Sequence, residues 1–467
     1  MVRSSTLFPV LAAVLSLLHH RIHAQVDGTF DPTFVQGTGF AGDVYTIARQ
    51  ADGKLLIAGD ELSLYNGTQV PAVVRLGADG ALDTSFDAGE GPDGRVHRIA
   101  VQADGRILVG GTFFNFDGVP SRRLVRLMPN GSVDGTFAIG TAANDWVDDL
   151  VIQPDGRILV AGHFDQFNGV NVGGIVRLMA DGSIDPSFNT GTGAEAEVYA
   201  IALRTDGRMV LGGYFSSFNG LTRNKVVQLN ANGSVDTSFD PGVGGGSGVS
   251  IRALATTPDG KLLCGGDLFS WAGATVNGLV RLNADGSPDA GFDASATAQY
   301  GLLDVIVQSD GHILFCGSQG VDRVTSTGAD DPGFDTGSGF FGGLQVVVDL
   351  EMLPDGRVLA GGQFDAYDGH AVGSIVRLTN ADVGVRDEAV TSMRVWPNPS
   401  SGTIRVNTGD PGALMSIRIL DPVGRVVDRV QLRNDGMELR LPSDPGTYMV
   451  EVGTSAGGVM RLPVVRE

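Results

Sequence analysis

The side chains best suited to chemistry in this chain fall in two adjacent columns of a repeated sequence pattern. The tripeptide Asp-Gly-Arg, or its Lys or His variant, recurs at seven regularly spaced positions that begin with Asp52, and the residues seven and six places before its Asp change from copy to copy. Together the two columns contain hydroxyl, imidazole, guanidinium and carboxylate groups, which bind polar ligands and transfer protons. The first column contains Tyr45, His97, Asp148, Tyr199, Arg252, Leu303 and Val348, and the second contains Thr46, Arg98, Asp149, Ala200, Ala253, Asp304 and Asp349.

From these columns we choose a set of candidate ligand-binding residues, and we add Trp146, an aromatic side chain among carboxylates in the segment NDWVDD. If the columns open the innermost strand of each unit, their side chains line one mouth of a central channel. A structural interpretation stays open, in which they only pack between units or carry solvated charge. The candidate residues are Tyr45, His97, Arg98, Trp146, Asp148, Asp149, Tyr199 and Arg252.

An enzyme, such as a polysaccharide lyase or hydrolase, is a second open interpretation. It requires the reactive atoms of a subset of these residues to lie within about 10 Å around one water-accessible pocket. The remaining histidines are scattered over different units and form no His-x-x-x-His or His-Glu-x-x-His pair, and the Asp-rich turns lack the spaced carboxylates of a calcium loop. The preferred interpretation therefore has no metal, no cofactor and no catalytic residue. The enzyme subset is His97, Arg98, Asp148, Asp149 and Tyr199.

The elements that must position these residues are short strands in seven units. The regularly spaced Asp-Gly-Arg tripeptides are 52, 51, 51, 53, 51 and 45 residues apart, and a second marker, Asp-x-x-Phe, recurs at seven positions from Asp31 to Asp331, out of phase with the first. Within a unit such as Val96 to Phe137, Asp-Gly and Asn-Gly dipeptides separate β-prone runs. These are hairpin signals, because such residues accept positive φ. Each unit is predicted to be a four-stranded antiparallel meander.

The second run of each unit, such as RILVGG, is apolar at successive positions rather than alternating, which predicts packing on both faces. A four-stranded sheet covered on both sides by its own copies is a propeller blade. Paired glycines such as Gly110-Gly111 are predicted where neighbouring sheets crowd together, although the second also suits a turn. A recurrent Arg in Val-Arg-Leu is expected to bond the Asp of Asp-x-x-Phe or blade carbonyls; its copies are Arg75, Arg126, Arg177, Arg281 and Arg377.

The first and last units explain each other. The seventh unit ends without its Asp-x-x-Phe strand, whereas Asp27 to Phe34 (DGTFDPTF) is such a strand with no unit before it. We predict that this strand completes the last blade, which removes the open sheet edge. The fold class is therefore all-β: a seven-bladed β-propeller closed by an N-terminal strand, followed by a small C-terminal β-sandwich. The sixth unit lacks its hairpin, so a clipped turn is expected there.

The N-terminus and the composition limit the partners. Residues 1–24 have a basic start, an apolar run and a small residue at Ala24, which is typical of a secretory signal peptide too short to span a bilayer. The net charge of −20 disfavours nucleic acid, and no later segment is apolar enough for a transmembrane helix. Export would permit a disulfide between Cys264 and Cys316, although both also suit buried strand positions. A monomer is expected.

The repeat resembles the bacterial delta-60 repeat through three motifs. They are Asp-Gly-Arg, then L-[VL]-x-G-G-x-F-x-x-[FY]-[ND]-G, then V-R-L-x-x-[DN]-G-S-x-D-x-S-F. That family is of unknown function and is predicted to form propellers, and it supplies no catalytic residues to carry over. The resemblance extends from Asp27 to Thr379.

The tail, from Met393 onward, is different. Its segments VWPNPSSGTIRV, IRILDPVGRVVDRV and LPSDPGTYMVEV are similar to the C-terminal sorting domain of the type IX (Por) secretion system of Bacteroidetes. The resemblance implies export through the periplasm, recognition of residues 393–467 by the secretion machinery, and release or attachment at the outer cell surface. From the residues alone, the tail is a small β-sandwich. The motif residues are Pro397, Asn398, Pro399, Gly402, Asp421, Gly424, Arg425, Gly446 and Tyr448.

These observations give one domain plan and one functional hypothesis. The plan is a signal peptide at 1–24, a propeller at 25–379, a linker at 380–392 and a sorting domain at 393–467. The hypothesis is an exported, non-enzymatic propeller scaffold for binding or adhesion, with a glycan or a surface protein as its ligand.

Overall fold

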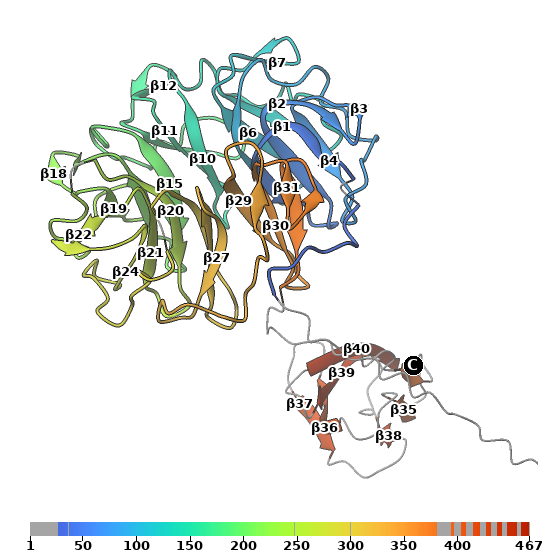
Figure 1. The fold of residues 1–467 in the computed structure, drawn as a ribbon. Coiled ribbons are helices and arrows are strands. Elements are labelled where there is room, and N and C mark those ends of the chain that lie inside the picture. Colours follow the sequence, from blue (N-terminus) through green and yellow to red (C-terminus); the bar gives the residue numbers. More distant parts are fainter. Residues whose placement is uncertain are drawn as a thin grey trace, which may run out of the picture.

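The structure is a computed structural model that describes residues 27–380, apart from 36, 247 and 299, and seven strands between 394 and 466. The predicted signal peptide at 1–24 and residues 381–392 of the predicted linker lie outside the described residues. The described chain is all-β (Figure 1). Within it, no helix is long and apolar enough to cross a membrane.

Up to residue 380, one sheet order repeats: an inner strand pairs with a middle strand, which pairs with a third strand (Figure 1). The inner strands are β1 (Phe40–Arg49), β5 (Val96–Val101), β10 (Val147–Ile152), β15 (Val198–Leu203), β20 (Ile251–Thr256), β25 (Leu302–Val307) and β29 (Val346–Met352). The middle strands are β2 (Leu55–Tyr65), β6 (Ile107–Gly111), β11 (Ile158–Gly162), β16 (Met209–Gly213), β21 (Leu262–Gly266), β26 (Ile313–Gly317) and β30 (Val358–Gln363). The third strands are β4 (Val73–Leu76), β9 (Leu124–Leu127), β14 (Ile175–Leu178), β19 (Val226–Leu229), β24 (Leu279–Leu282), β27 (Gly320–Val324) and β33 (Ile375–Leu378).

The predicted fourth strand is shorter than expected. In six sheets the Asp-x-x-Phe segment joins the third strand through a single antiparallel bridge, such as Leu127 to Val133. The chain then turns, because the Asp134 carboxylate accepts the Thr136 N–H at 3.0 Å and the Asp134 carbonyl accepts the Phe137 N–H at 3.2 Å. The prediction of four full strands was therefore wrong in length, although the segment lies where it was expected.

The N-terminal segment occupies the same position beside the last sheet. Phe30 forms an antiparallel bridge with Leu378 of β33. The Gly28 N–H donates to the Thr379 carbonyl at 2.6 Å, and the Asp31 N–H donates to the Arg377 carbonyl at 2.9 Å. Main-chain bonds thus connect the two ends of the repeat region.

Small hairpins follow the middle strands in every sheet except that of β25, β26 and β27. There β26 leads directly into β27, with Gly317 opposite Gly320, which confirms the clipped turn. The first hairpin is formed by the end of β2 with β3 (Thr68–Gln69). The others are β7 (Asn115–Phe116) with β8 (Val119–Pro120), β12 (Gln166–Phe167) with β13 (Val170–Asn171), β17 (Ser217–Phe218) with β18 (Leu221–Thr222), β22 (Ser270–Trp271) with β23 (Ala274–Thr275), and β28 (Phe340–Phe341) with β31 (Ala366–Tyr367) and β32 (His370–Ala371).

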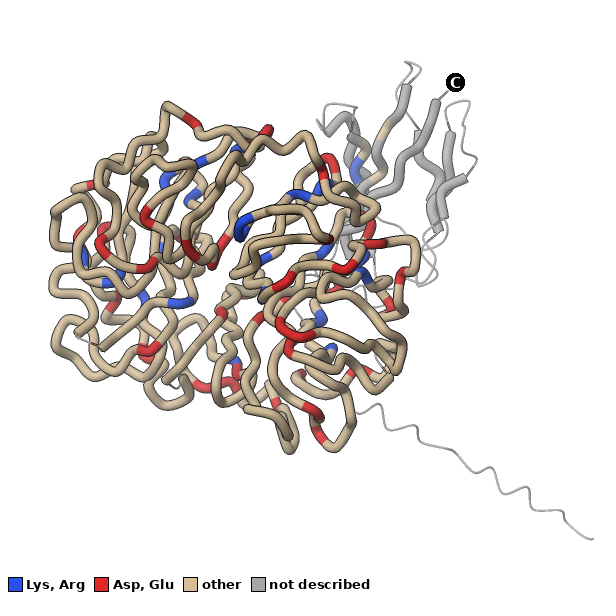
Figure 2. Tube along the Cα trace, turned by 90° about the horizontal axis from the view of Figure 1, so that it is seen from above, with Lys and Arg blue, Asp and Glu red and all other residues tan. Residues whose placement is uncertain are grey.

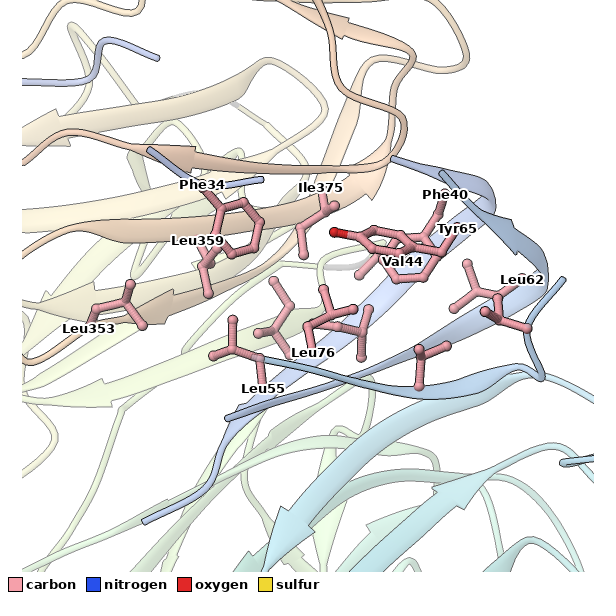
Figure 3. Packing of buried hydrophobic residues seen from close by; sticks show 14 residues of the cluster. Phe34, Phe40, Val44, Leu55, Leu62, Tyr65, Leu76, Leu353, Leu359 and Ile375 are labelled. Atoms are coloured by element: carbon pink, nitrogen blue, oxygen red, sulfur yellow. The ribbon is translucent and has the colours of Figure 1, made fainter. Parts of the chain in front are cut away.

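The core consists of apolar layers between successive sheets. All residues of β6, β11, β16, β21 and β26 are buried, as their continuous apolar runs predict. One layer joins the first and last sheets: Phe34 and Val44 pack in one cluster with Leu359 and Ile375 (Figure 3). The core is therefore shared between units rather than held inside each one.

The two cysteines belong to these layers. Cys264 in β21 and Cys316 in β26 are both free and fully buried. Burial raises the pKa of both thiols, so they behave as small apolar side chains. Of the two alternatives from the sequence, buried packing is therefore the one observed.

An arginine latch joins six of the seven third strands to the following unit. The Arg75 Nε donates to the Asp83 carboxylate at 2.8 Å, Nη1 donates to the Pro129 carbonyl of the next unit at 2.6 Å, and the guanidinium lies 4.9 Å from the Phe86 ring centre. Both predicted kinds of partner are confirmed. The other latch arginines are Arg126, Arg177, Arg281, Arg323 and Arg377.

The fourth unit rebuilds the latch from a different position. Gln228 replaces the usual arginine and donates to Asp236 at 2.7 Å. Arg204 stands where most other units have Gln; it donates to the Gly260 carbonyl at 2.6 Å and lies 5.9 Å from the Phe239 ring centre. The arginine and the glutamine have exchanged places in sequence, and a bond to the next unit is kept at a different carbonyl, that of Gly260 before the middle strand rather than one after the third strand.

The tail contains two antiparallel sheets. One has the order β34 (Arg394–Trp396), β35 (Thr403–Asn407), β38 (Met437–Arg440), and the other has the order β37 (Val426–Val430), β36 (Leu414–Leu420), β39 (Gly446–Thr454), β40 (Val459–Arg466). Gly446 opens β39 and Tyr448 is buried within it. The other motif residues lie outside the described residues: Pro397, Asn398, Pro399, Gly402, Asp421, Gly424 and Arg425.

Candidate functional site

Each inner strand contains a β-bulge at the same place. In β5, for example, Val96 is opposite Gly111 and Arg98 is opposite Gly110, so His97 is the extra residue. A bulge interrupts the alternation of side chains and redirects them, which allows two successive residues to face the same space. The bulged residues are the first variable column: Tyr45, His97, Asp148, Tyr199, Arg252, Leu303 and Val348.

The paired glycines make room for this geometry. A Cβ on Gly111 would lie 2.0 Å from the Arg95 carbonyl oxygen across the bulge, whereas a Cβ on Gly110 would lie 2.6 Å from the Val147 side chain of the next sheet. The first glycine therefore permits sheets to crowd together, as predicted. The second permits the bulge rather than a turn at the strand end, which the sequence analysis did not foresee.

The bulges surround one cavity of about 140 Å³. Seven of the eight candidate residues line it, and the eighth, Trp146, lies beside it with its ring 6.1 Å from the His97 ring. The cavity lining also contains Ala200, Ala253 and Leu254. The candidates in the lining are Tyr45, His97, Arg98, Asp148, Asp149, Tyr199 and Arg252.

Arg98 lies among carboxylates from other units. Its guanidinium is 3.0 Å from Asp349 and 3.3 Å from Asp149. Burial raises the pKa of Asp349 to about 7, although Arg98 opposes that shift and Asp304 adds to it. Burial likewise raises the pKa of Asp149 and of Asp304, again opposed by Arg98. About 40% of the Arg98 side chain is exposed, and it lines the cavity.

Next to Arg98 and its aspartates, one carboxylate contacts two histidines. Asp148 lies 3.0 Å from His97 Nδ1 and 3.3 Å from His163 Nε2. The Trp146 ring is 4.8 Å from the His163 ring and is 43% exposed. Fixed imidazoles on both sides therefore hold an exposed indole at the rim.

Beside these histidines, the rim also pairs aromatic rings with arginines: the His163 ring lies 5.6 Å from the Tyr199 ring, and the His97 ring lies 6.4 Å from the Tyr45 ring. The Arg252 guanidinium lies 4.8 Å from the Tyr199 ring centre and 3.2 Å from the Asp267 carboxylate. Burial raises the pKa of Tyr199 to about 12, so its hydroxyl remains a neutral donor at physiological pH. Tyr45 is placed similarly beneath Arg95, with 5.2 Å between guanidinium and ring centre.

Sequence reasoning missed one column of rim residues. His163, Asp267 and Gln363 each follow the last glycine of a middle strand, one residue beyond the pair that flanks the bulge. The signal was available, because this column varies as much as the two that were chosen. Its members are Asp60, Thr112, His163, Tyr214, Asp267, Ser318 and Gln363.

The charge of the cavity lining is negative. Two arginines and four aspartates line it, which gives a formal charge of −2. Acidic positions also outnumber basic ones in the chain as a whole, and many of them lie in its loops (Figure 2). Within the part of the chain that the structure describes, no group of three or more His, Cys, Asp or Glu is arranged to hold a metal ion.

A second hollow, of about 440 Å³, lies elsewhere, among the latch residues of the third and fourth units. It is lined by Arg157, Arg177 and their turn neighbours. Arg177 already bonds Asp185 and Ser187, and Arg157 lies 3.0 Å from Asp185. Its polar groups thus serve the latch, and none of the variable columns reaches it.

Two family models match the chain. The model described as "Domain of unknown function (DUF5122) beta-propeller" matches residues 50–86, 102–137, 153–188, 204–239, 257–292 and 353–382. The model described as "Secretion system C-terminal sorting domain" matches residues 394–465. The matched segments do not include the sixth unit, whose hairpin is missing.

The solved structures that match share little sequence with this chain. PorZ, titled an essential surface component of the type-IX secretion system of Porphyromonas gingivalis, is 16% identical, with 91% of this chain and 59% of that chain covered and a TM-score of 0.42. The extracellular domain of a putative hybrid two component system from B. thetaiotaomicron is 12% identical, with 94% and 58% covered and a TM-score of 0.49. This chain thus spans less than two thirds of both. The search of curated proteins gave no match.

The repeats and the tail define a class: an all-β propeller-repeat protein exported through type IX secretion to the cell surface or the medium. The chain belongs to the DUF5122 β-propeller family and carries a Por-type C-terminal sorting domain. Both resemblances drawn from the sequence are confirmed.

Proposed function

We propose that this protein is a non-enzymatic binding scaffold: a seven-bladed propeller, closed by its N-terminal strand, whose channel mouth binds a glycan or a surface protein outside the cell. The domain plan stays as drawn from the sequence, with the two sheets of the tail packed as a small sandwich. The single observation that carries the binding role is the series of bulges, which directs the most variable residues of an otherwise uniform repeat into one cavity.

Contacts between the first and last units support a closed ring. Arg377 of β33 donates to Asp31 at 2.8 Å and to the Ala78 carbonyl of the first unit at 2.9 Å, so it repeats the latch that other units make with their successors. At the mouth, the Ile47 N–H of β1 donates to Asp349 of β29 at 2.6 Å. The latch contacts, the apolar core and the hydrogen bonds at the mouth therefore all extend from the last unit to the first.

The enzyme alternative meets its geometric requirement in part, because its five residues line one cavity. Their polar groups are nevertheless engaged with one another. His97 bonds Asp148, and Arg98 pairs with Asp149 and Asp349, so a nucleophile or a free general base is not apparent among them. The negative lining also disfavours lyase chemistry on uronates, since an anionic substrate needs uncompensated positive charge. Binding is therefore favoured over turnover.

The test is a glycan array probed with the full exported chain. We expect binding to a subset of glycans, and we expect Tyr199→Ala in the cavity wall to abolish it. Phe269→Ala is the matched control, since Phe269 is also an aromatic residue, 48% exposed, but does not line the cavity. Absence of any glycan or surface-protein binding by the wild type, or hydrolysis of an array glycan, would contradict the proposal.

A further inference from the structure

The main-chain amides around the mouth share one hydrogen-bonding device. The N–H one residue past the second column donates to a side chain of the preceding unit. The Ile99 N–H donates to Thr46 Oγ1 at 3.2 Å, and the Ile201 N–H donates to Asp149 Oδ2 at 2.8 Å. The Ile47 and Leu350 amides do the same with Asp349 and Asp304.

Two further units lack an acceptor in the preceding unit and use their own. For the Leu150 N–H, the residue at the acceptor position of the preceding unit is Arg98, whose side chain cannot accept a hydrogen bond. The Leu150 N–H donates instead to Asp149 Oδ1 at 2.9 Å. For the Val305 N–H, the residue at that position is Ala253, which has no acceptor. The Val305 N–H donates instead to Asp304 Oδ1 at 2.8 Å. Six of the seven equivalent amides thus have a side-chain acceptor, supplied from one side or the other.

The seventh amide, that of Leu254, is different. The preceding unit offers Ala200 and its own unit offers Ala253, and neither side chain has an acceptor. The register of β20 on β21 equals that of β15 on β16, so the Leu254 N–H points the way the Ile201 N–H does, toward the channel. Ala200, Ala253 and Leu254 all line the cavity.

Leu254 is half-buried, and a backbone N–H that faces a cavity without a protein acceptor needs a partner that enters the cavity. Around the rest of the mouth the repeat meets this requirement internally. At Leu254 the repeat leaves the amide without an acceptor, and it leaves empty the space that a larger side chain would fill. An oxygen atom from a molecule in the cavity is the natural acceptor.

The surrounding groups restrict the chemistry of that molecule. It must accept from the Leu254 N–H, which a simple cation cannot do. It must tolerate a lining with a formal charge of −2, which disfavours a carboxylate or phosphate. It also meets acceptors, because Asp304 and Asp349 line the same cavity. A hydroxyl group both accepts and donates, so it satisfies all three conditions.

We infer that the gap at Ala200, Ala253 and Leu254 is a subsite for a ring hydroxyl of a neutral sugar. The hydroxyl oxygen accepts from the Leu254 N–H and its hydrogen turns to the aspartates. The exposed Trp146 at the rim offers an aromatic surface to the apolar face of the sugar ring. This inference rests on the proposed binding function and names the ligand class for it.

The test fills the gap with the acceptor used elsewhere in the ring. Ala200→Thr places at the fourth unit the residue type that Thr46 supplies at the first. With methyl hexosides of glucose, galactose and mannose as probes, we expect the tightest one to bind at least tenfold more weakly to this variant, while the thermal midpoint does not fall. Thr46→Ala is the matched control, since Thr46 does not line the cavity; it should lower the midpoint and leave hexoside binding within about twofold.

Hydrogen exchange gives a readout independent of the variants. Exchange of the peptide containing Leu254 should slow when the hexoside is added, while the peptide containing Ile201 should not change. Hexoside binding by Ala200→Thr within twofold of wild type, no added protection at Leu254, or preference for glucosamine or glucuronate would overturn the inference. Binding of a surface protein but of no array glycan would likewise overturn this inference alone, whereas a wild type that binds neither a glycan nor a surface protein would overturn the proposed function, so the two failures are distinguishable.

Discussion

The channel mouth and the face that carries the latch arginines, here called the latch face, differ in what repeats from unit to unit. On the latch face the side chains repeat: an arginine, an aspartate and an aromatic ring recur from unit to unit and hold each unit to the next. At the mouth the backbone repeats, as a bulge against a glycine, while the side chains differ. A uniform backbone with variable side chains therefore places individually different groups around one cavity.

The exceptions on the two faces teach the same lesson. When the latch loses its arginine at Gln228, Arg204 takes over, so a contact to the next unit is kept. When the mouth loses its acceptors at Ala200 and Ala253, no described side chain takes over, and a cavity lies there. The latch, where a lost contact is replaced by another residue, stabilises the fold. The mouth, where the lost acceptors are not replaced, is the surface for which we propose a ligand.

Breaking the latch should have the largest effect. Arg377→Ala removes one of the two guanidinium groups that pair with the buried Asp31, together with the bond to Ala78; Arg357 stays 2.7 Å from Asp31, so we expect the free energy of unfolding to fall by about 2 kcal/mol. Arg252→Ala at the mouth removes a half-exposed arginine and should cost less than about 1 kcal/mol. Denaturant unfolding of both variants measures the difference. Equal losses would mean that the two faces do not divide stability from binding.

Disturbing the bulge should have an intermediate effect. Gly111→Ala places a Cβ 2.0 Å from the Arg95 carbonyl oxygen, so either the bulge or the neighbouring strand must move, at a cost of about 1–3 kcal/mol. Gly135→Ala is the control, since no atom lies within 4 Å of the added Cβ and its φ is not positive. Thermal unfolding should separate the two variants clearly, and identical midpoints would show that the bulge does not need its glycine.

The pH dependence of stability should distinguish the mouth by a smaller effect. Because burial holds the pKa of Asp349 at about 7, the folded chain keeps a proton that the unfolded chain releases near pH 4. This site therefore stabilises the fold most at low pH, and its contribution declines as pH rises from about 4 to about 7, by at most about 1.4 kcal/mol per pH unit. The latch aspartates Asp31, Asp83 and Asp185 have lowered pKa values, so their contributions change only below about pH 4.

Asp349→Asn is the variant that isolates this contribution. It should remove most of the decline in thermal midpoint between pH 5 and pH 8. Asp322→Asn is the control: burial raises the pKa of Asp322 to about 6, and the residue does not line the cavity, so this variant should leave the decline above pH 6 in place. A decline in Asp349→Asn equal to that of the wild type would mean that Asp349 is already ionised throughout this range.

Much of the fold was readable because it depends on local chemistry. The Asp-Gly turns need positive φ, and Gly105 has a φ of 82°. Continuous apolar runs predicted the buried middle strands, and the missing hairpin predicted the clipped sixth unit. The fourth strand was overestimated, because the Asp side chains that recommend a strand boundary also turn the chain after one bridge.

The candidate site was found only in part for a different reason. Aligning the repeats singled out the residues at the bulges, since variation within a uniform pattern is visible in one sequence. It could not show that both columns face one cavity, because a regular strand would send neighbours to opposite faces. His163 was missed because it belongs to the strand across from the bulge, so its closeness to Asp148 is a matter of pairing.

The sequence by itself determined the repeat, its turns, the latch residues and the export tail, because each depends on residue types within one unit or one motif. Only the tertiary structure decided which units meet. Arg98 of one unit finds Asp149 of the next and Asp349 of the last, and Leu254 faces two alanines rather than an acceptor. Those partners are set by the curvature that accumulates from sheet to sheet, which no single unit encodes.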